Sequence, residues 1–173
     1  LIAGVTSFGI EYRATDSDAI INNVDFAPTI LELASQAAPA DMQGRSFVPI
    51  LCGETPSNWP KATYNRYWMH MTHHDVPAHF GIRTKKHKLI FFYGLPLDAA
   101  GALPEATPPH WELYDLEKDP YEDKNVIDDP RYAEVSRGLM QRLSELRSEI
   151  GDTDARHPDV QAAWEKSLQS QDN

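Results

Sequence analysis

Histidines gather in one short stretch of the sequence, HMTHHDVPAHFGIRT, which runs from His70 to Thr84. Four of the chain's seven histidines fall within its first ten residues, and Arg83 follows near its end. An imidazole binds metals or exchanges hydrogen bonds with a hydroxyl, and a guanidinium pairs with sulfate, phosphate or carboxylate. The stretch therefore poses two chemical alternatives, a metal site and a segment that contacts a substrate, beside an ordinary structural role.

The spacing of these histidines argues against a metal site. Ligands that share one face of a strand recur at i and i+2, and ligands on a helix recur at i and i+4. His73 and His74 are adjacent and would point apart on a strand, while His70 and His74 have helix spacing in a stretch where Pro77 and the aromatic residues favour strand and loop. Asp75 is the single carboxylate nearby. We therefore expect no metal ligands in this chain.

A substrate-contacting strand fits the spacing better. In a strand that runs through AHFGIRT, the side chains of His79 and Arg83 fall on one face, with Gly81 between them. This places an imidazole and an anion-binding guanidinium around a gap. The structural alternative is that Arg83 is a solvated sheet residue and His79 a half-buried one, and the residues themselves leave both interpretations open.

Other sources of chemistry are weak. The single cysteine, Cys52, lies in the turn-like sequence LCGET without neighbours that would activate a thiol. The acidic run DLEKDPYEDKNVIDDP lacks the alternating ligands, central glycine and terminal glutamate of an EF-hand, so it is interpreted as a solvated turn. Glycine-rich phosphate loops, G-x-S-x-G and H-E-x-x-H motifs do not occur.

Composition bounds the class of protein. The chain has 173 residues, 41% of them hydrophobic, which is enough for one sizeable core with an appended layer. A net charge of -10 argues against nucleic acid or an anionic membrane surface as the main partner. No apolar run approaches the roughly 18 residues of a membrane-spanning helix. One cysteine excludes an internal disulfide framework, and the beginning at Leu1, without an initiator Met, suggests a chain entered midway.

The pattern of apolar residues predicts the elements that position these side chains. We expect a short strand over 19–24 and a helix that begins near Asp25, carries Pro28 in its first turn and is ended by Pro39. After a turn-rich link, β-branched and aromatic residues predict antiparallel strands over 63–71, over two parts of 78–93 joined at TKKHK, and over 111–116.

The clearest predicted element is a helix near the C-terminus. Asp129 and Pro130 supply its cap and first turn, and Gly151 supplies its stop. One apolar stripe along it must lie against the sheet, and its members are Tyr132, Val135, Leu139, Leu143, Leu146 and Ile150. Beyond Gly151 we expect a polar tail in which Val160, Trp164 and Leu168 indicate one weak helix.

Three stretches together resemble the C-terminal part of a formylglycine-dependent sulfatase of the alkaline-phosphatase-like superfamily, of the type that acts on glycans. They are NVDFAPTILELA…MQGRSFVPIL (23–51), HFGIRTKKHKLIFFYG (79–94) and WELYDLEKDPYEDKNV (111–126). The resemblance implies an α+β fold. Residues 1–38 would be the tail end of the α/β catalytic domain, 39–62 a linker, 63–151 a subdomain of about four antiparallel strands packed on a C-terminal helix, and 152–173 a polar tail.

The resemblance also implies a chemistry that this chain does not complete. Sulfatases of this type hydrolyse sulfate esters or sulfamates with a calcium-held formylglycine, which arises from a cysteine in a C-x-P-S-R motif. Cys52 lies in LCGET and cannot be that residue. The calcium ligands belong to an upstream part of the family that is absent here. We therefore carry over no catalytic and no metal residue, and expect a fragment that is inactive alone.

The resemblance gives the histidine stretch a role in substrate binding. In related glycan sulfatases the segment that matches HHDVPAHFGIRT lies near the mouth of the active-site pocket. His79, together with His74 or Arg83, is therefore a candidate for binding the sulfated carbohydrate. The family implies a periplasmic, secreted or lysosomal location.

One further expectation follows from the fragment interpretation. Apolar side chains that would pack inside a larger domain, among them Val24, Phe26, Ile30 and Leu33, would face water, so self-association through this segment is expected. The alternative function is a non-catalytic module that binds an anionic glycan or a partner protein.

Overall fold

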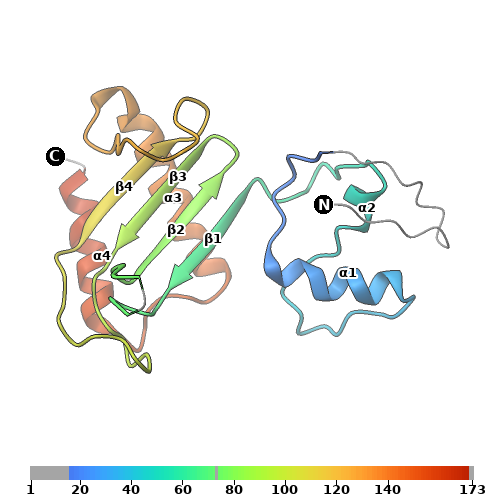
Figure 1. The fold of residues 1–173 in the computed structure, drawn as a ribbon, viewed down its shortest axis with the longest axis horizontal. Coiled ribbons are helices and arrows are strands. Elements are labelled where there is room, and N and C mark those ends of the chain that lie inside the picture. The colour runs from blue at the N-terminus through green and yellow to red at the C-terminus, as the bar shows by residue number, and fades with distance from the viewer. Residues whose placement is uncertain (1–15, 73, 172–173) are drawn as a thin grey trace. The chain divides into compact units, whose positions relative to one another are not determined.

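A computed structural model describes residues 16–72 and 74–171, with side chains up to residue 169 (Figure 1). The chain divides into two compact units, residues 1–63 and residues 64–173. None of the helices within the described ranges has the length and apolar character that crossing a membrane requires.

The first unit is held together around the start of its main helix. A 3-10 turn, η2 (Asn23–Asp25), leads into α1 (Phe26–Leu33), and a short helix, α2 (Val48–Leu51), follows. The buried Asp25 carboxylate accepts hydrogen bonds from the backbone N–H groups of Asn22 and Arg45, both at 2.8 Å. The Thr29 hydroxyl accepts one from the Phe47 N–H at 2.9 Å. A small apolar cluster of Phe47, Ile50 and Trp59 completes this unit.

The helix predicted to begin near Asp25 is confirmed as α1. Its end and the segment before it differ from the prediction. The helix ends at Leu33 and not at Pro39, because Ser35 takes a left-handed backbone conformation (φ 56°). Residues 19–22 are irregular and the 3-10 turn follows, so the strand expected over 19–24 is wrong. A strand needs a neighbour for its backbone groups. None of the described residues of the first unit forms one beside this segment.

The second unit contains the predicted four-stranded antiparallel sheet. Its strands, β1 (Ala62–Tyr67), β2 (His79–Thr84), β3 (His87–Phe92) and β4 (His110–Asp115), lie in the order β1-β2-β3-β4. The register sets His79 opposite Phe92, and Phe92 opposite His110. The strand predicted over 63–71 is shorter than expected and ends at Tyr67, where the chain turns away and the His70 N–H bonds the Trp68 carbonyl at 2.8 Å.

Both long helices cover the same face of this sheet (Figure 1). They are α3 (Ala133–Glu149), preceded by the 3-10 turn η3 (Pro130–Tyr132), and α4 (Pro158–Gln171). Asp129 caps the first turn as predicted, and Gly151 (φ 74°) follows the helix end. Ile150, expected in the buried stripe, is 47% exposed. The core between sheet and helices is formed by Phe80, Ile82, Leu89, Phe91, Trp111, Leu113, Leu139, Leu143, Val160 and Trp164.

The segment after α3 contributes more than the polar tail expected for residues 152–173. Val160 and Trp164 of α4 are buried, and the Trp164 ring lies 5.2 to 5.4 Å from the rings of Phe80, Phe91 and Trp111. The buried Asp154 pairs with the guanidinium groups of Arg66 on β1 and Arg147 on α3. The last helix is therefore part of the core of the second unit.

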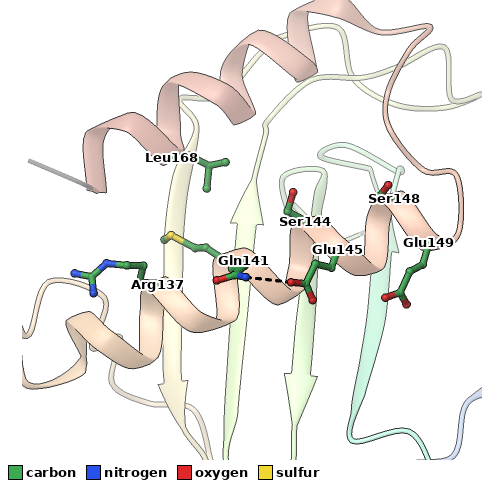
Figure 2. Close-up of a pocket in the computed structure, with 8 residues that line it drawn as sticks. Arg137, Gln141, Ser144, Glu145, Ser148, Glu149 and Leu168 are labelled. Carbon is green, nitrogen blue, oxygen red and sulfur yellow. Dashed lines mark hydrogen bonds between the residues drawn. The ribbon is translucent and has the colours of Figure 1, made fainter.

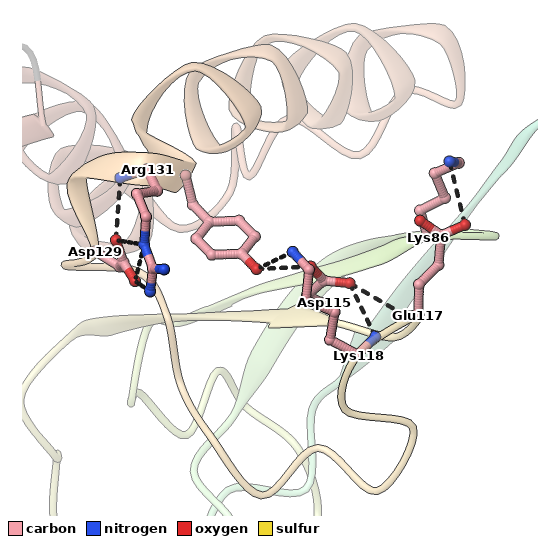
Figure 3. Close-up of polar contacts among 7 residues, drawn as sticks. Lys86, Asp115, Glu117, Lys118, Asp129 and Arg131 are labelled. Carbon is pink, nitrogen blue, oxygen red and sulfur yellow. Dashed lines mark hydrogen bonds and ion pairs between the residues drawn. The ribbon is translucent and has the colours of Figure 1, made fainter.

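The acidic run after β4 forms the polar turn that the sequence predicts. The Asp115 carboxylate accepts hydrogen bonds from the Lys118 ammonium (2.7 Å) and the Tyr132 hydroxyl (2.6 Å), which joins β4 to η3 (Figure 3). These two donors hold the pKa of Asp115 below its usual range. Beside them, Arg131 pairs with Asp129, whose pKa is lowered to about 2.

Candidate functional site

Two of the predicted site residues, His79 and Arg83, lie on the face of the sheet opposite the helices. At one end of this face an aromatic row crosses all four strands, formed by Tyr67, His79, Phe92 and His110. The His79 ring is 5.3 Å from the Tyr67 ring and 4.9 Å from the Phe92 ring, measured between centroids. The His110 ring stacks on Phe92 at 4.4 Å, with the two planes 3° apart. The row fixes the position and the plane of the His79 imidazole.

The hydrogen bond of His79 determines which ring nitrogen carries the proton. Its Nδ1 lies 2.8 Å from the Pro77 carbonyl oxygen. A carbonyl can only accept, so Nδ1 is assigned as the donor, and Nε2 of the neutral ring is left as an acceptor. Burial lowers the pKa of His79 and outweighs the opposing effect of the Pro77 hydrogen bond. At neutral pH the side chain therefore presents an unprotonated nitrogen that suits a hydroxyl or amine donor.

Arg83 shares the face of β2 with His79, as predicted, but the two side chains are not neighbours. Four residues of strand separate their Cα atoms by about 13 Å. Arg83 is exposed and lies opposite Lys88, and within the described residues no ion pair engages its guanidinium. Gly81, between them, lies against β3: a Cβ there would come within 2.5 Å of the Leu89 carbonyl oxygen. The two side chains can contact opposite ends of an extended ligand but cannot hold one small group together.

His74 is exposed in the turn before β2, while His73 lies outside the described residues. His70 is fully buried, and both of its ring nitrogens contact backbone. Nδ1 accepts from the Ala78 N–H at 3.1 Å, and Nε2 lies 2.9 Å from the Glu105 carbonyl. His70 thus fastens the turn that carries His74 to the 95–109 loop. Its role is structural, because neither nitrogen is free for a metal.

The donor set of the described residues does not fit the calcium centre that the sulfatase resemblance implies. Within residues 16–72 and 74–171, no three side chains among His, Cys, Asp and Glu converge in a way that could hold a metal ion. Cys52 is exposed at the end of α2. The chemistry that these residues offer is hydrogen bonding and anion pairing, through the acceptor nitrogen of His79 in the aromatic row and through the Arg83 guanidinium about 13 Å along the strand.

Three hollows of the second unit are lined by other residues. One follows the solvent side of α3 beneath α4, where Gln141 donates a hydrogen bond to Glu145 at 3.2 Å (Figure 2). A second lies beside β4 and α4 and is lined by His110, Trp111 and Lys166. A third, at the end of β1, is lined by Trp68, Arg156 and His157. None of the three is lined by His74, His79 or Arg83.

The four-stranded antiparallel sheet with helices on one face is an architecture that solved structures of alkaline-phosphatase-like sulfatases share. One solved structure, of a protein in complex with its substrate D-glucosamine-2-N,6-O-disulfate, matches with a TM-score of 0.65 and 40% identity over 79% of this chain and 25% of that chain. A 2-O glycosaminoglycan sulfatase matches with a TM-score of 0.55 and 26% identity over 86% of this chain and 28% of that one.

Sequence comparison gives the family. Residues 9–149 match the family model described as N-sulphoglucosamine sulphohydrolase, C-terminal, and the chain belongs to that family. An N-acetylglucosamine-6-O-sulfatase of Bacteroides thetaiotaomicron is 41% identical over 140 residues, which are 80% of this chain and 23% of that protein. The human N-sulphoglucosamine sulphohydrolase is 25% identical over 79% of this chain and 34% of its own length. The chain thus spans about a quarter to a third of these relatives.

Proposed function

We propose that this chain is the C-terminal portion of a sulfatase that hydrolyses sulfate esters or sulfamates of carbohydrates, and that it supplies part of the rim of the substrate pocket. The observation that carries the proposal is the 41% identity to an N-acetylglucosamine-6-O-sulfatase over most of the chain. In this proposal the calcium and the formylglycine belong to upstream sequence, and the purified 173-residue chain releases no sulfate.

The residues proposed to bind the carbohydrate are His79, His74 and Arg83. The support for His79 is its fixed ring plane and its free acceptor nitrogen. The support for Arg83 is its exposure on β2, the strand that also carries His79. The support for His74 is its exposure on the turn before β2. Because about 13 Å of strand separates His79 from Arg83, we assign them to different sugar units or to different ends of one substrate.

The test uses the full-length protein that contains this chain. Sulfate release is measured from N-acetylglucosamine 6-sulfate and from N-sulfoglucosamine. Alcohol release is measured from a phosphonate monoester, since a phosphonate monoester hydrolase of Agrobacterium radiobacter shares this fold (TM-score 0.53, 26% identity). We expect release of sulfate from at least one sugar and a lower kcat/KM, by about tenfold or more, in His79→Ala. His87→Ala, at the other end of the sheet, is the matched control.

Two results would contradict this proposal. Turnover of the phosphonate alone would assign the protein to another hydrolase class. Equal kcat/KM values in His79→Ala, Arg83→Gln and the wild type would remove the proposed rim contacts while leaving the sulfatase assignment in place. The alternative function, a non-catalytic module for an anionic glycan, requires sulfated glycan to bind the full-length protein without turnover.

A further inference from the structure

The third hollow of the second unit has the lining of a carbohydrate site and is separate from the predicted residues. It has a volume of about 370 Å³ and lies between the end of β1 and the loop that joins α3 to α4. Trp68 forms one wall and is 53% exposed, which is unusual for the largest side chain in proteins. The opposite loop contributes Arg156 and His157. Ligand pockets in proteins begin at about this volume.

The lining of this hollow carries two arginines, Arg66 and Arg156, and Arg66 is engaged by aspartates. Asp152 and Asp154 also line it, but both are committed: Asp152 pairs with Arg66 and Tyr64, and Asp154 pairs with Arg66 and Arg147. These two carboxylates balance the two buried guanidinium groups. Arg156 is exposed, and within the described residues no ion pair engages it. It therefore remains available to an anion, on a chain whose net charge is -10.

The Trp68 indole and the loop that carries Arg156 are both connected to the buried Arg66 side chain. The Arg66 guanidinium, 3% exposed, lies 5.9 Å from the Trp68 ring and is fixed from the other side by its two aspartates. The same aspartates anchor the loop that carries Arg156. An exposed indole offers a flat apolar surface with a polar edge, which suits the C–H face of a pyranose, and a guanidinium suits a sulfate or carboxylate.

We propose that this hollow binds an anionic saccharide unit, with Trp68 stacked on the sugar ring and Arg156 paired with its sulfate or carboxylate group. His157 supplies a further hydrogen-bonding group at the same wall. The site lies at the opposite edge of the sheet from His110, and it is independent of the rim contacts proposed for His79.

The experiment titrates the 173-residue chain and follows the indole N–H signals by NMR. The probes are N-acetylglucosamine 6-sulfate, glucuronate, N-acetylglucosamine and inorganic sulfate. We expect the two anionic sugars to shift the Trp68 signal, and the neutral sugar and the free sulfate to bind about tenfold more weakly. Trp68→Ala and Arg156→Gln should each weaken binding of the sulfated sugar by about fivefold to tenfold.

Matched controls are Tyr121→Ala, which removes another exposed aromatic ring, and Arg137→Gln, which removes another exposed guanidinium. Both should bind like the wild type, and unchanged thermal unfolding shows that all four variants fold. Wild-type affinity in Trp68→Ala and Arg156→Gln would overturn the proposal, as would free sulfate that binds as tightly as the sulfated sugar. Loss of binding in His79→Ala alone would place the sugar at the sheet face and also overturn it, while leaving the proposed function standing.

Discussion

Two arginines are buried in the second unit, and both pair with the same carboxylate. The side chains of Arg66, Arg147 and Asp154 are 3%, 6% and 2% exposed. Removing one partner from a buried ion pair leaves an uncompensated charge, which costs far more than the pair itself contributes. The stability of this region therefore depends on Asp154 more than on any single apolar contact of the same loop.

We predict that Asp154→Ala lowers the free energy of unfolding by about 3 to 5 kcal/mol. Denaturant unfolding followed by circular dichroism measures the change. Glu149→Gln is the control, because the Glu149 pair with Arg142 is exposed and should be worth less than about 1 kcal/mol. Similar losses in the two variants would show that burial does not govern the energetics of these pairs.

The His79 ring gives a second prediction at this scale. Burial lowers its pKa, so the folded state favours the neutral imidazole. Because the folded pKa lies below the unfolded value of about 6.5, the stabilisation is fully present above pH 6.5 and is lost as the pH falls through the folded pKa. We expect ¹⁵N NMR of the ring to show protonated Nδ1 at pH 7 and a midpoint below 6.5.

Tyr67→Ala should open the ring to water and raise this midpoint toward 6.5. A midpoint at or above 6.5 in the wild type, or a proton on Nε2 at pH 7, would contradict the assignment of Nε2 as the free acceptor.

The sequence predicts part of this site because strand alternation is local. His79 and Arg83 fall on one face by spacing alone. Tyr67 and His110 come from strands whose pairing depends on register, which no local pattern in this chain reveals. The sequence also does not reveal the structural role of His70. Its partners, the Ala78 N–H and the Glu105 carbonyl, are backbone groups that two loops bring together.

Among the elements, α4 shows how a weak periodic signal can hide a core helix. Only three large apolar residues recur along it, at Val160, Trp164 and Leu168, because most of its surface faces water. The apolar stripe of α3 has more members, so its sequence predicts the helix more clearly. Buried Ser136 and Arg147 belong to its inner face as well. Polar residues whose partners are distant in the sequence do not contribute to a hydrophobic pattern.

We predict that Trp164→Ala destabilises the second unit by about 3 to 5 kcal/mol, since the indole packs on Phe80, Phe91 and Trp111. Trp164→Phe should lose less, and Gln161→Ala, on the exposed side of the same helix, should stay within about 0.5 kcal/mol of the wild type. Thermal unfolding gives the ranking. If Trp164→Ala unfolds at the same temperature as the wild type, α4 does not pack on the sheet in solution.

At the scale of the whole molecule, the described part of the first unit, residues 16–63, has a small core. The buried apolar cluster within these residues consists of Phe47, Ile50 and Trp59, while Val24, Phe26 and Ile30 are 53%, 41% and 62% exposed. Leu33, expected to share this exposure, is half-buried. In a protein that contains the upstream part of the family, these side chains would have apolar neighbours. In the 173-residue chain they form a surface that favours association.

We therefore predict that the 173-residue chain self-associates through α1 in a concentration-dependent way. Ile30→Lys places a charge at the most exposed of these positions, and together with Val24→Lys it should shift the chain to monomer in sedimentation velocity at concentrations where the wild type forms dimers or larger species. Tyr121→Lys, at an exposed site of the second unit, adds the same charge and should change nothing. If the wild type stays monomeric across the concentration range, or if Tyr121→Lys dissociates it equally well, the exposed face of α1 is not the surface responsible.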